Sequence, residues 1–230
     1  MSNLPARFYL NFIEDDRWKY LVTGLKNTLI VAFFAVMIGV AIGCVLALIR
    51  TTHDKTGKLG ALNVFAKIYL TVIRGTPTTI QVLICYFVLF GPWDVSKLVA
   101  ASIAFGLNSG AYVAEIFRSG IMSIDRGQSE AGRSLGLNYS KTMQLIIMPQ
   151  AIKNILPALG NEFIVLLKET SVAGFIALQD LTKGADIIRS RTYDAAMPLF
   201  AAALIYLVMV VGLEKLFGML ERRMAKSDYR

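Results

Sequence analysis

Several ionisable side chains stand inside long apolar runs, where a charge is costly. Glu162 lies about eight residues, or about 12 Å at helical rise, into the run 154–175, and so near the middle of a bilayer. A charge at that depth costs roughly 2.5–3.5 kcal/mol on insertion scales. Glu162 would either balance the amine or guanidinium of a solute or make a structural hydrogen bond to a neighbouring helix. We favour the solute role.

The run 98–117 carries three more candidate solute-binding residues. Asn108 and Ser109 predict a break in its middle, and backbone freed at that depth is tolerated where it lines a cavity. The alternative is a small-residue packing contact between helices. Glu115 is the third candidate, but Arg118 follows it by one helical turn, so we favour a mutual ion pair.

Two further groups are predicted to shape the path. Arg74, Gly75 and Pro77 indicate a kink with a buried cation. Arg74 would meet a solute carboxylate or phosphate-like group or, as we favour, anchor the kink to an acidic neighbour or to backbone carbonyls. Lys168 and Glu169, near the outer end of the fourth run, would either gate the cavity or compensate each other.

Recognisable catalytic and metal-binding arrangements are missing from the sequence. Its one histidine, His53, lies in a polar loop, and Cys44 and Cys85 lie in apolar runs as packing residues. There is no glycine-rich nucleotide loop and no nucleophile–base pair at a recognisable spacing. We therefore expect no enzyme activity, cofactor or metal in this chain, and any ATP must be hydrolysed by another subunit.

A polar segment, 127–157, separates two of the apolar runs. Its opening predicts a short helix over 129–136, with small residues, Ala131 and Gly132, on a face that another surface can approach closely. Gly136 suits a left-handed helix end, and Asn138 or Ser140 can cap the next helix. Two prolines, Pro149 and Pro157, are predicted to interrupt that second helix.

The composition indicates a membrane protein. Of the 230 residues 55% are hydrophobic and 17% charged, whereas soluble domains average about 45–50% apolar residues. The net charge of +8 would suit nucleic acid, but positive cytoplasmic loops explain it better, so we expect membrane lipid and no nucleic acid as a partner.

Hydrophobicity and charge together predict an all-α membrane protein with five crossings, at 28–49, 76–90, 98–117, 154–175 and 197–217. Residues 61–73 suit a helix near the inner interface. Basic residues exceed acidic ones after the first, third and fifth crossings, so the N-terminus is predicted outside and the C-terminus in the cytoplasm.

The predicted organisation is one membrane domain at 26–222. It contains the cytoplasmic segment 123–153 and is flanked by an external segment at 1–25 and a cytoplasmic tail at 223–230.

Nearly end to end, the chain resembles permease subunits of bacterial polar amino acid ABC importers, of the histidine, glutamine and arginine type. The resemblance rests on Arg74–Pro77, Ala111–Arg118, Gly127–Gly136, Pro149–Ala151, Leu156–Ile164 and Lys168–Ser171. The segment 127–157 resembles the "EAA" loop of these permeases, with Glu-Ala-Gly in place of Glu-Ala-Ala. An ordinary amphipathic loop is the alternative, but the combination of motifs is specific.

The resemblance implies a type I importer fold with five transmembrane helices in the bacterial plasma (inner) membrane. It also implies a second permease, identical or different, an external solute-binding protein, and a cytoplasmic ATPase dimer that binds ATP and Mg. The coupling helix that docks on the ATPase would consist of Gln128, Ser129, Glu130, Ala131, Gly132, Arg133, Ser134, Leu135 and Gly136.

The solute is less closely defined. In family members with a membrane-embedded site, an acid at the position matching Glu162 faces the substrate, which favours arginine, lysine or histidine here. The alternative is glutamine, cystine or another neutral or acidic polar amino acid. An ion-coupled secondary carrier is a different class, but it would typically show internal repeats and more crossings.

Overall fold

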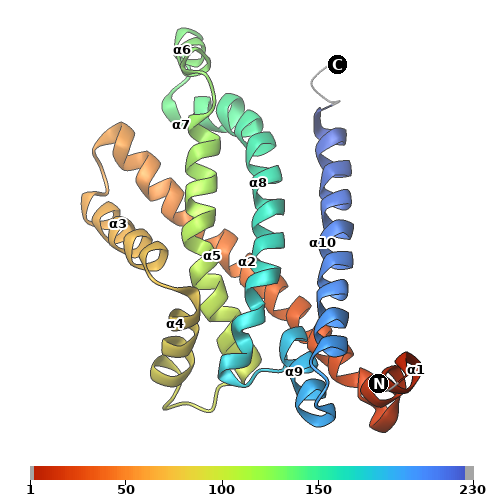
Figure 1. Ribbon diagram of the computed structural model, residues 1–230. Coiled ribbons are helices and arrows are strands. Elements are labelled where there is room, and N and C mark those ends of the chain that lie inside the picture. The colour runs from red at the N-terminus through yellow and green to blue at the C-terminus, as the bar shows by residue number, and fades with distance from the viewer. Residues whose placement is uncertain (1–2, 226–230) are drawn as a thin grey trace.

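The computed structural model describes residues 3–225, and the elements within that range are all helical (Figure 1). Three short helices come first: α1 (Leu4–Phe8), η1 (Tyr9–Ile13) and η2 (Glu14–Asp16). The first half of the bundle comprises α2 (Trp18–Thr56), α3 (Gly60–Gly75), α4 (Thr78–Leu83), η3 (Ile84–Leu89) and α5 (Lys97–Met122). The remainder comprises α6 (Arg126–Ser134), α7 (Tyr139–Thr142), η4 (Met143–Ile147), α8 (Met148–Glu169), η5 (Thr170–Ile176), α9 (Leu181–Thr192) and α10 (Ala196–Ala225).

The centre of the bundle is α5, which packs against α2, α3, α4 and α8. Small residues allow α2 to cross α5 closely: a Cβ added at Gly43 would lie 2.7 Å from the Ala114 backbone nitrogen. Gly39 lies one turn earlier and faces Ser109 in the same way. Membrane helices associate through such small-residue contacts, because lipid provides no hydrophobic driving force between them.

The two ends of the bundle carry different elements (Figure 1). One end carries α6, the start of α8 and the ends of α2 and α10. The opposite end carries α1, α9 and the end of η3. Among residues 3–225, α2, α5 and α10 are long and apolar enough to cross a membrane, and the bent pair α3–α4/η3 is a fourth candidate. Four charged residues dilute the hydrophobicity of α8, so the five-crossing orientation remains a prediction.

The predicted kink after Arg74 is confirmed, whereas the predicted break in α5 is wrong. A bend of 110° separates α3 from the α4–η3 helix, because Thr76 is extended before Pro77. In contrast, α5 continues through Asn108 and Ser109. Their side chains hydrogen-bond to Gln81 and Glu162 on neighbouring helices. They therefore do not compete for the backbone hydrogen bonds of α5, and the helix continues.

The prediction that Pro149 and Pro157 interrupt the second helix of the polar segment is wrong. Pro149 lies in a helix that is already running, and its missing N–H is tolerated beside the irregular hydrogen bonding of a π-helical turn. The π-helical turn η4 precedes it and continues into α8. Pro157 lies inside α8 without ending it.

Part of the predicted outer loop at 176–196 is the helix α9. Leu181, Ala185 and Ile188 form its fully buried face, which packs with Leu21 of α2 and Ala202 of α10. The spacing of these three residues and the capping residue before them, Asp180, are helix signals present in the sequence.

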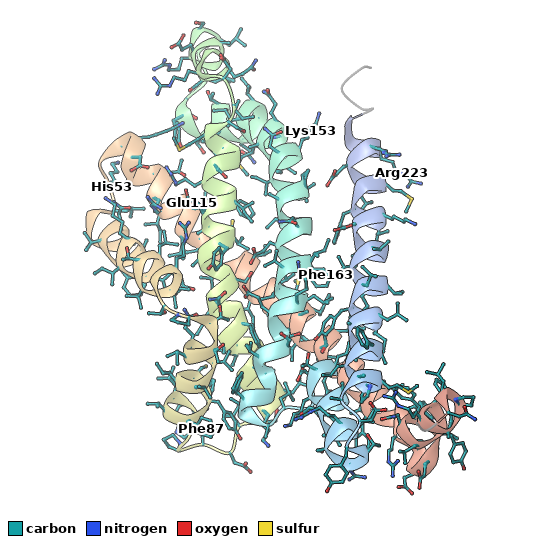
Figure 2. All side chains as sticks on the ribbon, viewed as in Figure 1. His53, Phe87, Glu115, Lys153, Phe163 and Arg223 are labelled. Atoms are coloured by element: carbon teal, nitrogen blue, oxygen red, sulfur yellow. The ribbon has the colours of Figure 1, made fainter. Side chains whose placement is uncertain are left out.

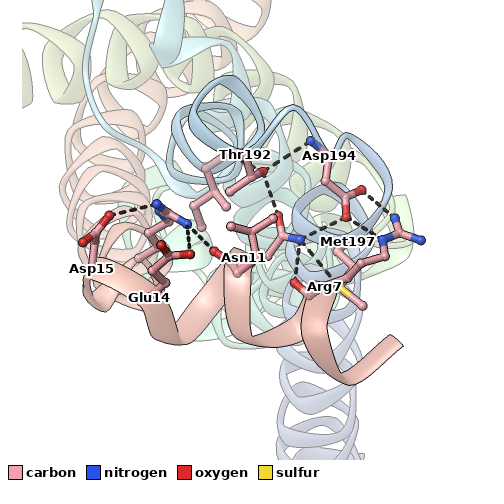
Figure 3. Close-up of polar contacts among 10 residues, drawn as sticks. Arg7, Asn11, Glu14, Asp15, Thr192, Asp194 and Met197 are labelled. Atoms are coloured by element: carbon pink, nitrogen blue, oxygen red, sulfur yellow. Dashed lines mark hydrogen bonds and ion pairs between the residues drawn. The ribbon is translucent and has the colours of Figure 1, made fainter. Parts of the chain in front are cut away.

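The residues before α2 fold back onto the turn between α9 and α10 (Figure 3). Arg7 pairs with Asp194 at 2.7 Å, the buried Asn11 side chain donates to Asp194 at 3.0 Å, and Thr192 donates to Asn11 at 2.9 Å. The hydrogen bond from Arg7, assisted by that from Asn11, lowers the pKa of Asp194 to about 2. We call this network the N-terminal clasp.

The predicted boundary between residues 25 and 26 falls inside α2, which begins at Trp18. Of the predicted tail, residues 226–230 lie outside the described residues.

Candidate functional site

Glu162 and Ser109 form a buried polar contact between α8 and α5. The Ser109 hydroxyl donates to Glu162 Oε1 at 2.8 Å, and both residues are at least nine-tenths buried. Within residues 3–225, the second oxygen, Oε2, accepts no hydrogen bond and no cation forms an ion pair with the carboxylate. The contact is the structural hydrogen bond that the sequence allowed, but it occupies only one of the two carboxylate oxygens.

Asn108 points to a different neighbour than Ser109. Its amide donates to Gln81 Oε1 at 2.8 Å, and Gln81 in turn donates to the carbonyl groups of Ile73 and Thr76 at 2.7 and 3.0 Å. Successive residues on a helix project about 100° apart, so Asn108 holds the α3–α4 kink while Ser109 reaches α8. Gln81 was missed from the sequence, although it is an isolated amide in an apolar run.

Glu115 belongs to an ion-pair cluster and not to the contact around Glu162. Arg118 lies 3.1 Å from one of its oxygens and Arg50 lies 3.5 Å from the other, so the predicted Glu115–Arg118 pair is confirmed. Ser109 precedes Glu115 by six residues, about 9 Å of helix. Figure 2 shows Glu115 in the half of the molecule nearer α6, and Phe87 near the opposite end.

The other predicted path residues are less buried than expected. Arg74 is exposed, and its guanidinium lies 5.9 Å from the centre of the Tyr112 ring. The predicted buried cation is therefore wrong for the single chain, because the kink turns this side chain away from the core. Lys168 is exposed and Glu169 half-buried. No ion pair joins these two in the described part of the chain, since adjacent helical residues do not face each other.

The predicted short helix in the polar segment is present as α6. Asp125 caps it by accepting from the Gly127 N–H at 2.7 Å. After its end, Gly136 has φ +75 and the Leu137 N–H donates to the Gly132 carbonyl, as in a Schellman motif. The Asn138 side chain caps α7. The end at Gly136 and the Asn138 cap are therefore confirmed, whereas the helix begins three residues earlier than predicted.

Most of α6 is open to contact from outside. Leu135 is 76% exposed, and Glu130, Ala131 and Arg133 are also exposed. Gly132 is buried instead, and a Cβ there would lie 2.6 Å from Thr142 Cγ2. The close approach predicted for the small residues is therefore made at Gly132, by Thr142 of the same chain. Ala131 remains available to another surface.

A cavity of about 650 Å³ lies beneath α6, between the ends of α2 and α5. Lys55, Arg118 and Arg133 are among its lining residues. The Lys55 ammonium lies 5.1 Å from the Tyr139 ring and connects the end of α2 to α7. Gly132 of α6 packs against Thr142 of α7, and α7 runs on through η4 into α8, the helix that carries Glu162.

Comparisons with known proteins agree with these features. The model of the family described as binding-protein-dependent transport system inner membrane component matches residues 39–226. A putative glutamine transport system permease protein of Rickettsia felis is 38% identical over 209 residues, 89% of this chain and 93% of the relative. The arginine transport system permease protein ArtQ of Bacillus subtilis is 38% identical over 212 residues, 91% of this chain and 94% of the relative.

A solved structure gives the same answer for the fold. It is described as the crystal structure of an amino acid ABC transporter with histidines. The TM-score is 0.82 at 44% sequence identity, covering 89% of this chain and 94% of the other. The expected type I importer fold and the multi-pass inner-membrane location are thus confirmed. The chain belongs to the binding-protein-dependent transport system inner membrane component family and is a permease subunit of an amino acid ABC importer.

Proposed function

We propose that this permease carries a cationic amino acid, with Glu162 as the counter-charge inside the membrane. The observation that carries the proposal is a buried carboxylate with one oxygen held by Ser109 and the other without a partner within residues 3–225. A buried charge is costly unless it is paired. The amine or guanidinium of arginine, lysine or histidine would supply the missing pair during passage.

The alternative substrate is glutamine or another polar amino acid that carries no extra positive charge. The name of the Rickettsia felis relative favours glutamine, and that of the Bacillus subtilis relative favours arginine. For a neutral solute, Glu162 would serve only its hydrogen bond with Ser109.

We further propose that α6 transmits the movement of a cytoplasmic ATPase dimer to the bundle. The exposure of α6 supports this role, as does the packing of its Gly132 against Thr142, whose helix runs on into α8. A loaded external binding protein would dock at the opposite end, near residues 91–97 and 176–196, and a second permease, identical or different, would complete the path. Coupling requires that α6 be packed differently in the inward-open and outward-open states. ATP and Mg would be bound by the ATPase.

The substrate proposal is tested by comparing Glu162→Gln with Ser109→Ala in the reconstituted complex. Glutamine keeps an acceptor for the Ser109 hydroxyl and removes only the charge. We expect Glu162→Gln to lose arginine uptake by at least roughly tenfold, the equivalent of about 1.4 kcal/mol, while Ser109→Ala retains the charge and most of the uptake.

Glutamine uptake and arginine-stimulated ATP hydrolysis are measured in the same vesicles. If Glu162→Gln transports arginine at the unaltered rate, Glu162 is not the counter-charge. If glutamine is the solute carried by the unaltered complex, the alternative holds.

A further inference from the structure

A groove of about 350 Å³ between α2 and α3 brings three basic side chains together. Lys67 and Arg74 lie two turns apart on one face of α3, and Arg50 faces them from the last turns of α2. The groove is completed by Leu70 and Thr71. We call it the basic groove.

The charges in the basic groove are only partly compensated. Lys67 and Arg74 are exposed and form no ion pair within residues 3–225. Arg50 is 3.5 Å from Glu115, but Glu115 also binds Arg118 at 3.1 Å. Arg50 Nε is buried and has no hydrogen-bond partner among the described residues. In the described part of the chain, the one carboxylate paired with a basic residue of the groove is Glu115, which Arg50 shares with Arg118, so the groove is a net positive site.

The helix that forms the groove also presents an apolar face to its surroundings. Leu62, Phe65, Ile68 and Val72 are each about half or more exposed, while Asn63, Ala66 and Leu70 form the buried face of α3. A membrane helix of this kind covers its apolar face with acyl chains. Arg74, in the last turn of α3, can extend its aliphatic stem along the helix toward Arg50 and place its charge at the headgroup level.

We propose that the basic groove binds the phosphate of an acidic phospholipid whose acyl chains lie along the exposed face of α3. Basic pockets between membrane helices on the cytoplasmic side are suited to such headgroups. The groove is separate from the Glu162 contact, because α3 and α8 pack on different sides of α5 (Figure 1). Only the choice of the cytoplasmic leaflet rests on the proposed function, since it assumes that the α6 end faces the cytoplasm.

The test compares lipid binding to the purified transporter complex by native mass spectrometry. The complex is titrated with dioleoyl phosphatidylglycerol or with dioleoyl phosphatidylcholine, which has the same chains. We expect the unaltered complex to prefer phosphatidylglycerol, and the double variant Lys67→Gln/Arg74→Gln to bind it roughly tenfold more weakly.

The matched control is Lys215→Gln/Arg222→Gln. These two residues are also exposed and seven apart on one helix, α10, but they line no part of the basic groove. The control should bind phosphatidylglycerol within about twofold of the unaltered complex. The charge-preserving variant Lys67→Arg/Arg74→Lys should keep the preference for phosphatidylglycerol. That result would show that the weaker binding of Lys67→Gln/Arg74→Gln is not a folding defect.

Three outcomes would overturn the proposal. Equal binding of the two lipids by the unaltered complex, or equal loss in the Lys67/Arg74 and Lys215/Arg222 variants, would mean that no lipid site exists here. Displacement of the lipid by millimolar inorganic phosphate or glutamate would assign the groove to a soluble anion. A change in permease copy number in the Lys67/Arg74 variant would assign it to a subunit interface. None of these readouts depends on transport.

Discussion

At the scale of single residues, polar side chains inside the bundle act as links between helices. Ser109 joins α5 to α8, and Asn108 joins α5 to the kink through Gln81. The sequence identifies Asn108 and Ser109 as special, because amides and hydroxyls are rare in apolar runs. It does not identify their partners, because a partner depends on which helices become neighbours.

The N-terminal clasp gives a pH prediction at the same scale. The pKa of Asp194 is lowered from 3.8 to about 2 by the Arg7 hydrogen bond. A lowered pKa means that the ionised form stabilises the folded clasp above about pH 4, and that this contribution is lost as the pH falls toward 2. We therefore expect protection of residues 3–17 from hydrogen exchange to fall between pH 5 and pH 2.5, and to be low at both in Asp194→Asn.

The control for the clasp is Asp186→Asn. Lys183 and Arg189 also lower the pKa of Asp186, but all three residues lie on α9. The Asp186→Asn variant should keep the acid-dependent release of residues 3–17. If Asp194→Asn shows the same protection and the same pH profile as the unaltered chain, the Arg7–Asp194 pair does not hold the segment.

At the scale of elements, local signals predicted α6 better than they predicted the helices around it. Asn138 and Gly136 determine caps and helix ends through their own chemistry, and both act as expected. The continuity of α5 and α8 was missed, because tertiary packing and the π-helical turn η4 accommodate residues that are unfavourable in an isolated helix. The helix α9 was missed because its balanced charges suggested an external loop.

The contact between Gly132 and Thr142 tests how α6 is joined to α8. In Gly132→Ala, the new Cβ would lie 2.6 Å from Thr142 Cγ2 and 2.8 Å from its Oγ1. The two elements would have to move apart, so we expect transport-coupled ATP hydrolysis to fall severalfold at an unchanged amount of assembled complex. The double variant Gly132→Ala/Thr142→Ala removes both clashing atoms and should recover most of that activity.

Ser140→Ala is the control, because Ser140 lies two residues before Thr142 but is exposed and outside the coupling helix. It should leave the coupling nearly unchanged. Full activity of Gly132→Ala alone would show that the α6–α7 packing does not transmit movement. Failure of the double variant to recover would locate the defect at another contact.

At the scale of the whole molecule, the open question is whether α8 crosses the membrane. Its hydrophobicity is diluted by Lys153, Glu162, Lys168 and Glu169, although the fold places it beside α5 (Figure 1). If α8 crosses, residues just before it and those in α9 lie on opposite sides. Ser140 and Ser190 are both exposed and flank α8, which makes them a matched pair of reporter positions.

We predict that Ser190→Cys is external and Ser140→Cys is cytoplasmic. Each is introduced with Cys44→Ala and Cys85→Ala, which remove the two natural thiols. A membrane-impermeant maleimide added to intact spheroplasts should label only the cysteine at position 190, and permeabilisation should add the one at 140. Labelling of both positions in intact spheroplasts would show that α8, the fourth predicted crossing, does not span the membrane. Labelling of position 140 alone would invert the orientation, place α6 outside the cell and so exclude its contact with a cytoplasmic ATPase.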